Sequence, residues 1–134
     1  MNIVDIEGIG ATYAAGLEGA GVTTTDDLLA AGATKAGRQK LAEATGISET
    51  LILGWVNKAD LMRITGVGTQ YSDLLELAGV DSPAELAQRN AANLAQTFQE
   101  AVAARPDRVR RIPTEAEVAG WIAEAKGLSK IVEH

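Results

Sequence analysis

Two glycines that flank a valine, followed by a hydroxyl and an amide side chain, form the stretch of this chain best suited to chemistry: Gly66, Val67, Gly68, Thr69 and Gln70. Glycine adopts positive φ readily and allows another backbone to approach closely, so the two glycines predict a tight turn between helices, with Gly68 at positive φ. The first N–H groups of the following helix have no intrahelical partners and can bind an anion. The chemistry predicted here is the binding of an anionic group, such as a phosphate, by backbone amides.

Basic side chains that could assist such binding lie on both sides of this turn. Lys58 and Arg63 precede it, and residues 105–111 contain four arginines and one aspartate. The candidate site that the sequence predicts therefore combines the turn residues with four arginines: Arg63, Gly66, Val67, Gly68, Thr69, Gln70, Arg108, Arg110 and Arg111.

The arginine run has two plainer interpretations. It can bind an acidic partner, or it can form a solvated loop in which arginines pair with Glu115 or Glu117. The chain has a net charge of −6. That charge excludes a broadly basic nucleic-acid-binding surface but permits a local phosphate contact.

Catalytic and metal-binding chemistry is not indicated. The chain has no cysteine, and its one histidine is His134. Asp26 and Asp27 form a carboxylate pair, but they lie at the start of a predicted helix, where acidic residues interact favourably with the helix dipole. The sequence holds no nucleophile–base set, no metal-ligand spacing and no Walker loop. We therefore expect a non-catalytic protein that uses no metal and no cofactor.

The glycine turn occurs twice because the chain contains an internal repeat. Aligning each residue with the one 58 positions later gives ten identities over the 24 positions 6–29, and residues 8–10 then match residues 66–68. Further along, at an offset of 66, Trp55 matches Trp121. A duplication explains this agreement, with the added residues at or near the arginine run. We expect two pseudo-symmetric halves with the two tryptophans in equivalent buried positions.

Capping residues and glycines predict where the helices begin and end. The predicted helices are residues 11–20, a helix capped by Thr24 that reaches Ala31, residues 35–45, a helix capped by Ser48 that is continuous or kinked at Asn57, residues 70–78, and helices capped by Ser82, Asn90 and Thr114, of which the last ends at Gly127. No segment shows sustained strand-like alternation. The sequence predicts an all-α fold of two repeats, residues 1–63 and 64–134, packed into one compact domain.

Residues 8–10 and 66–68, each followed by a tyrosine, an apolar helix and Ala-Gly-Val, resemble the helix-hairpin-helix superfamily. The run from Gly66 to Leu86 is similar to hairpin domains of bacterial DNA ligases and of the N-terminal domains of archaeal recombinases. Over nearly its whole length the chain more closely resembles small stand-alone bacterial proteins with a tandem hairpin domain of unknown function. The resemblance implies a SAM-like bundle of short helices, and such hairpins commonly hold DNA phosphates through backbone amides without reading sequence.

The chain departs from the DNA-binding pattern of this superfamily at its hairpins. DNA-binding hairpins usually have proline before the first glycine, where this chain has Glu7 and Thr65. They often have lysine or arginine after the second glycine, where this chain has Ala11 in one hairpin and Thr69 in the other. Because Glu7 would place a carboxylate near a bound phosphate, we interpret the first hairpin as structural and expect the second to contact nucleic acid.

We therefore predict a non-catalytic, sequence-independent nucleic-acid-binding module that contacts DNA phosphates weakly through the second hairpin. The alternative is a protein–protein interaction or assembly module that uses the same SAM-like surfaces, which the charge and the absent hairpin lysines favour. No apolar run approaches the length of a membrane span, and the first residues are acidic rather than basic. We expect no membrane contact and a cytoplasmic location.

Overall fold

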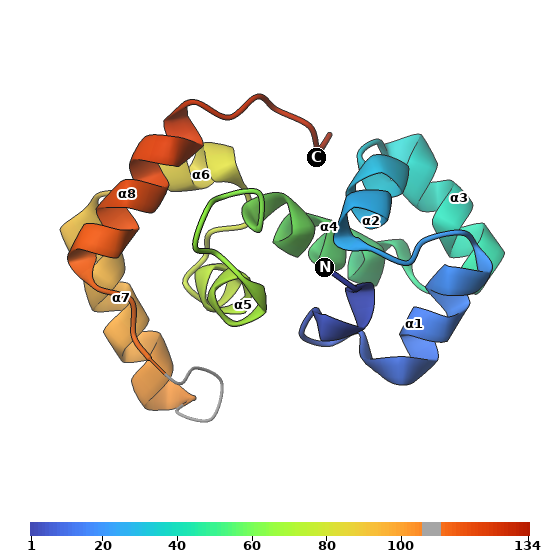
Figure 1. Cartoon of the computed structure of the whole chain (residues 1–134), viewed down its shortest axis with the longest axis horizontal. Coiled ribbons are helices and arrows are strands. Elements are labelled where there is room, and N and C mark those ends of the chain that lie inside the picture. The colour runs from blue at the N-terminus through green and yellow to red at the C-terminus, as the bar shows by residue number, and fades with distance from the viewer. Residues whose placement is uncertain (106–110) are drawn as a thin grey trace. The chain divides into compact units, whose positions relative to one another are not determined.

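The computed structural model describes residues 1–105 and 111–134, and in those residues it contains eight α-helices and one short 3₁₀ helix (Figure 1). The only strand-like pairing in this part of the chain is an isolated bridge between Asn2 and Thr24, so the all-α prediction is confirmed. The contacts divide the chain into two compact units. Unit 1 comprises residues 1–60 and 130–134, and unit 2 comprises residues 61–129. The packing of both halves into one body stays a prediction.

Unit 1 is built from the helices η1 (Ile3–Asp5), α1 (Gly10–Gly19), α2 (Thr25–Gly32), α3 (Lys35–Thr45) and most of α4 (Glu49–Leu61). The Thr24 side chain accepts a hydrogen bond from the Asp27 N–H, and Asp27 completes a capping box at the start of α2. Gly46, at φ +73°, ends α3 in the left-handed conformation. Of the two predictions for α4, the continuous helix is right. Local capping interactions therefore set the start of α2 and the end of α3.

The segment of residues 130–134 packs into unit 1, although it follows the whole of unit 2 in sequence. Val132 is 1% exposed, and the Glu133 N–H donates to the Ala33 carbonyl over 2.7 Å. Arg38 is 4% exposed and donates from Nη2 to the Glu133 carbonyl, at 2.6 Å, and from Nη1 to two carbonyls at the end of α2. One apolar side chain and one buried guanidinium thus hold the segment in place, a contact that no pattern in the sequence predicts.

Unit 2 contains α5 (Thr69–Leu77), α6 (Pro83–Ala87), α7 (Ala91–Ala104) and α8 (Glu115–Lys126). Helices α6 and α7 pack against α8, and α5 packs against α7 (Figure 1). The core of the unit joins residues from all four helices and from the segments on either side of α5: Leu61, Ile64, Val67, Leu74, Leu75, Val80, Leu86, Leu94, Phe98, Val118, Trp121, Ile122 and Ala125. Burial of this apolar surface is the main force that holds these short helices together.

The helices of unit 2 begin at the predicted caps. Asn90 caps α7, and Thr114 forms a full capping box with Glu117 at α8. The capping box expected at Ser82 is only half formed. The Ser82 hydroxyl accepts from the Glu85 N–H over 3.1 Å, but the Glu85 carboxylate pairs with an arginine four residues on.

The two tryptophans lie in equivalent environments, as the repeat predicts. Trp55 is 4% exposed and lies 5.2 Å from the Tyr13 ring at an interplanar angle of 53°. Trp121 is 5% exposed and lies 5.3 Å from the Tyr71 ring at 51°. This agreement confirms that the halves are structurally related at their cores.

The glycines of the two turns agree at one position and differ at the other. Gly8 and Gly66 have φ of +92° and +89°. Gly10 has φ +62°, whereas Gly68 has φ −103° and ψ −158° as the N-cap of α5. The expectation of positive φ at Gly68 is therefore wrong, because extended backbone there directs the chain into the helix.

Gly66→Ala is expected to lower the free energy of unfolding by about 1–3 kcal/mol, since a side chain at positive φ is strained. An added Cβ would also lie 3.3 Å from Nε1 of Trp121. Gly68→Ala is the matched control, because its φ is ordinary and a Cβ there meets nothing within 4 Å. Urea denaturation of the two variants measures the difference, and equal losses would contradict this account of the turn.

Candidate functional site

The start of α5 is open. Gly68 is its N-cap, and no side chain forms a capping hydrogen bond there. The first helical bond runs from the Ser72 N–H to the Gly68 carbonyl at 2.9 Å, so the N–H groups of residues 69–71 lie before it. Helix α1, the repeat counterpart of α5, also lacks a side-chain cap. Side-chain oxygens cap the six other helices of the described chain, α2, α3, α4, α6, α7 and α8.

The turn before α5 presents a mixture of exposed and buried residues. Gly66 and Gln70 are exposed, and Thr69 is half-buried. Val67 is 4% exposed, and its N–H donates to the Ile64 carbonyl at 3.0 Å. Val67 therefore belongs to the core of unit 2, and its amide is used inside the turn.

A carboxylate already contacts this turn from α8. The Thr65 N–H donates to Oε2 of Glu124 over 2.6 Å. The equivalent residues in unit 1 are Glu7 and Lys58, and there Nζ of Lys58 donates to the Glu7 carbonyl at 3.1 Å. Both units thus connect the last helix of the repeat to the residue before the first glycine, but with opposite charges.

Two of the basic residues upstream of the turn have partners inside the protein. Lys58 is 8% exposed and belongs to unit 1. Arg63 is half-buried and donates from Nη2 to the Ser129 carbonyl at 3.0 Å. Their charges are thus partly used for holding backbone carbonyls rather than offered to a ligand.

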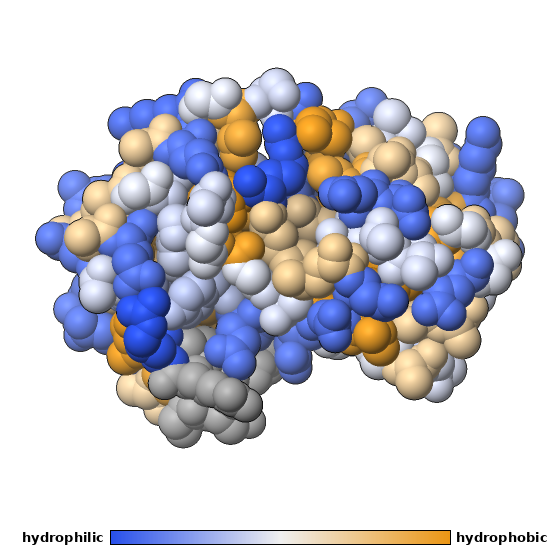
Figure 2. Space-filling model, viewed as in Figure 1, coloured by the Kyte–Doolittle hydropathy of each residue, from blue (hydrophilic) through white to orange (hydrophobic). Residues whose placement is uncertain are grey.

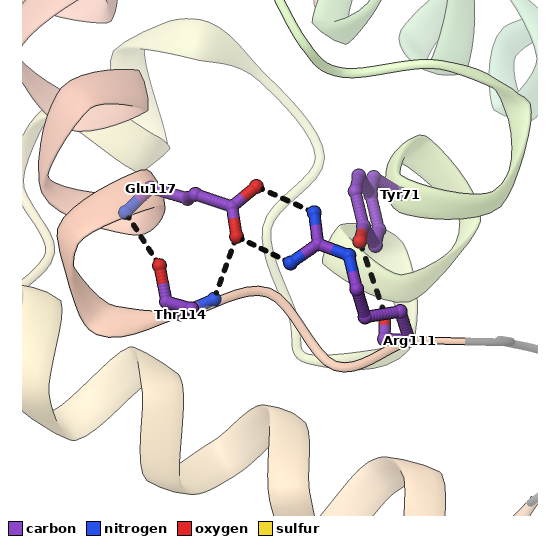
Figure 3. A network of polar contacts seen from close by, with 4 residues as sticks. All are labelled: Tyr71, Arg111, Thr114 and Glu117. Carbon is purple, nitrogen blue, oxygen red and sulfur yellow. Dashed lines mark hydrogen bonds and ion pairs between the residues drawn. The ribbon is translucent and has the colours of Figure 1, made fainter.

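Arg111 lies beside the start of α5 (Figure 3). Its guanidinium carbon is 6.0 Å from the centre of the Tyr71 ring, and the Tyr71 hydroxyl donates to the Arg111 carbonyl at 3.1 Å. Nη1 and Nη2 of Arg111 each donate to one oxygen of the Glu117 carboxylate, at 2.7 and 2.8 Å. Oε1 of Glu117 also accepts from the Thr114 N–H at 3.1 Å. Of the two pairings expected for the arginine run, the one with Glu117 is confirmed.

This ion pair shifts the pKa of both Arg111 and Glu117. Hydrogen bonds from Arg111, and then from the Thr114 backbone, lower the pKa of Glu117 to about 2, and Glu117 raises the pKa of Arg111. The side chains are 60% and 33% exposed, so solvent screens the pair and its contribution to stability is small. That contribution is complete above the ordinary carboxyl pKa of 4.5 and is lost as the pH falls towards 2.

The structure brings together part of the predicted site. Tyr71, in α5, joins Arg111 to the residues that follow the glycines. Arg108 and Arg110 lie outside the described residues. Glu124 and Tyr71 also lie next to the site, and neither neighbour was predicted from the sequence. The signal for Glu124 was its alignment with Lys58 at the offset of 66.

The described ranges 1–105 and 111–134 contain neither a metal-binding cluster nor a membrane-spanning helix. Within them no three histidine, aspartate or glutamate side chains gather closely enough to hold a metal ion. No helix in this part of the chain is both long and apolar enough to span a membrane.

Comparison with known proteins identifies the family of the chain. No curated protein and no solved structure matches it. One family model matches residues 7–128, a range that includes both glycine turns and both tryptophans. The chain therefore belongs to the family described as Domain of unknown function (DUF4332).

Proposed function

We propose that this protein is a non-catalytic nucleic-acid-binding module that holds backbone phosphates with the amides at the start of α5, without reading sequence. The observation that carries the proposal is the open start of α5 directly after a glycine turn, whereas the other helices of the described residues, α1 excepted, are capped by side chains. The resemblance of both turns to helix-hairpin-helix motifs supports the same function, and we propose that assignment for the two repeats.

Several groups around the turn suit a phosphate in type and position, whereas the Glu124 carboxylate on the Thr65 N–H opposes an anion there. Gly66 has no side chain to obstruct a ligand, and Thr69 and Gln70 carry hydroxyl and amide donors. The N–H groups at a helix start point outward and have the positive end of the helix dipole behind them. Arg111 adds a cation beside the same helix.

The charges predict weak binding that depends strongly on salt. The net charge is −6, and the basic groups near the turn are already bound to carbonyls or to Glu117. We expect two or three phosphates to be neutralised, which gives a slope of roughly −2 to −3 for the logarithm of the binding constant against the logarithm of salt concentration.

Thr69→Pro tests the amides directly. Thr69 is the first residue of α5, a position where proline fits a helix while removing one N–H donor. We expect Thr69→Pro to fold and to bind a fluorescently labelled DNA duplex several-fold more weakly than the wild type. Ala91→Pro places proline at the same position of α7 and is the matched control. Its affinity should equal that of the wild type.

Fluorescence anisotropy across a salt series measures both the affinity and the slope. A labelled duplex and a labelled single strand should bind with similar affinity whatever their sequence. Absence of binding to either at low salt, with protein at tens of micromolar, would refute the proposal. Equal losses in both proline variants would show that the open amides are not the ligands.

The second candidate is a protein–protein interaction or assembly module. The engagement of Lys58, Arg63 and Arg111 by groups of the protein itself favours it. On the face shown in Figure 2, hydrophobic residues appear in separate spots among hydrophilic ones. A partner for the exposed surface of either unit would therefore have to combine polar and apolar contacts. Light scattering at rising protein concentration tests self-assembly, the simplest form of this function.

A further inference from the structure

We infer that Arg111, held beside Tyr71, is a phosphate-binding subsite that the carboxylate of Glu117 occupies in the unbound protein. Glu117 and a phosphate of the ligand then compete for the same guanidinium. This inference rests on the proposed function, because the ligand is a phosphate of the nucleic-acid backbone. The inference also explains why Arg111, an exposed arginine beside α5, is already paired with a carboxylate.

The geometry of the pair is that of a bound oxyanion. Both terminal nitrogens of Arg111 donate to the two oxygens of one carboxylate, at 2.7 and 2.8 Å (Figure 3). The same planar fork accepts two oxygens of a phosphate, so a phosphate can replace Glu117 without a change in the arginine. The Arg111 side chain is 60% exposed, and a ligand can therefore reach it from solvent.

The backbone of Arg111 is fixed independently of its ion pair. The Tyr71 hydroxyl donates to the Arg111 carbonyl at 3.1 Å, and the Tyr71 ring packs against Trp121 at 5.3 Å. Because Tyr71 is the third residue of α5, this bond holds Arg111 next to that helix. If Glu117 releases the guanidinium, the arginine remains beside the open amides.

Glu117 also has a structural role that does not need the arginine. It is the third residue of α8, where its carboxylate accepts from the Thr114 N–H and its own N–H donates to the Thr114 hydroxyl. These two bonds can persist when a phosphate takes Arg111. The exchange then costs only a solvent-exposed ion pair, which is weak.

Glu117→Gln isolates the competition. Glutamine keeps the capping box at α8 and removes the charge that holds Arg111. We expect affinity for the labelled duplex to rise roughly three- to tenfold, and the salt slope to become steeper by about one, because one more phosphate contact forms.

Asp27→Asn is the matched control. Asp27 occupies the same capping-box position at α2, and its carboxylate accepts from the N–H groups of Thr23 and Thr24. It removes the same charge from the chain without touching Arg111. Its affinity should stay within about twofold of the wild type. The double variant Glu117→Gln/Arg111→Gln should lose the gain of the single one.

A second measurement separates the inference from the proposed function. NMR shifts of the Arg111 side chain are followed during titration with inorganic phosphate. Saturable shifts in Glu117→Gln and smaller ones in the wild type support the subsite, even if no nucleic acid binds. If the wild type binds the duplex and Glu117→Gln binds it with the same affinity, the inference is overturned and the proposed function stands. Absence of phosphate shifts in both proteins would overturn it as well.

Discussion

Trp121→Ala is expected to lower the free energy of unfolding of unit 2 by about 3–5 kcal/mol. The indole is 5% exposed and contacts two other rings, with Tyr71 at 5.3 Å and Phe98 edge-on at 6.4 Å. Its Nε1 also lies next to Gly66, so the turn before α5 loses its support. Removing the side chain creates a cavity where α5, α7 and α8 meet, and short helices have little other apolar surface to compensate.

Urea denaturation followed by circular dichroism measures this loss. Trp121→Phe is the control, since it keeps an aromatic ring in the cavity and should cost clearly less. Trp55→Ala should cost a similar amount in unit 1, because Trp55 has nearly the same exposure and ring geometry. A loss below about 1 kcal/mol for Trp121→Ala would show that the core does not depend on this ring.

Arg38→Ala is expected to cost about 2–5 kcal/mol, although it removes only one side chain from α3. Arg38 supplies donors to three carbonyls in a place where it is 4% exposed. Each buried acceptor left without a donor costs about 1–3 kcal/mol. Release of residues 130–134 limits the total, because the Glu133 carbonyl can then find water.

Amide hydrogen exchange distinguishes release of the segment from general destabilisation. The Glu133 N–H, bonded to Ala33, should lose its protection first in Arg38→Ala. Lys40→Ala removes the same charge from an exposed position of the same helix and should leave that protection unchanged. Retained protection at Glu133 in Arg38→Ala would contradict the role given to the guanidinium.

The sequence predicted those parts of the fold that depend on local chemistry. A threonine or serine cap acts on an N–H two or three residues away, so the starts of α2 and α8 could be placed from Thr24 and Thr114. The equivalent buried positions of Trp55 and Trp121 followed from the repeat, since duplicated cores keep their packing.

The parts that escaped prediction depend on residues far apart in the chain. Arg38 meets Glu133 across 95 positions, and Thr65 meets Glu124 across 59. No local sequence pattern identifies such a partner, because many other charged or polar residues of the chain could equally well fill its place. The conformation of Gly68 escaped for a related reason: glycine allows both signs of φ, and the surrounding packing decides between them.

The opposite charges that link α4 and α8 to their turns bear on how a duplicated chain folds correctly. Repeats of similar sequence can exchange equivalent helices while they fold. Such an exchange would take the Glu124 acceptor from the Thr65 N–H and the Lys58 donor from the Glu7 carbonyl, and it would put in each place a side chain of the opposite hydrogen-bonding type. A new hydrogen bond would require each side chain to turn to the other backbone group of that residue, so the native contacts are not reproduced. The inversion between Lys58 and Glu124 thus favours the pairing of each helix with the turn of its own repeat.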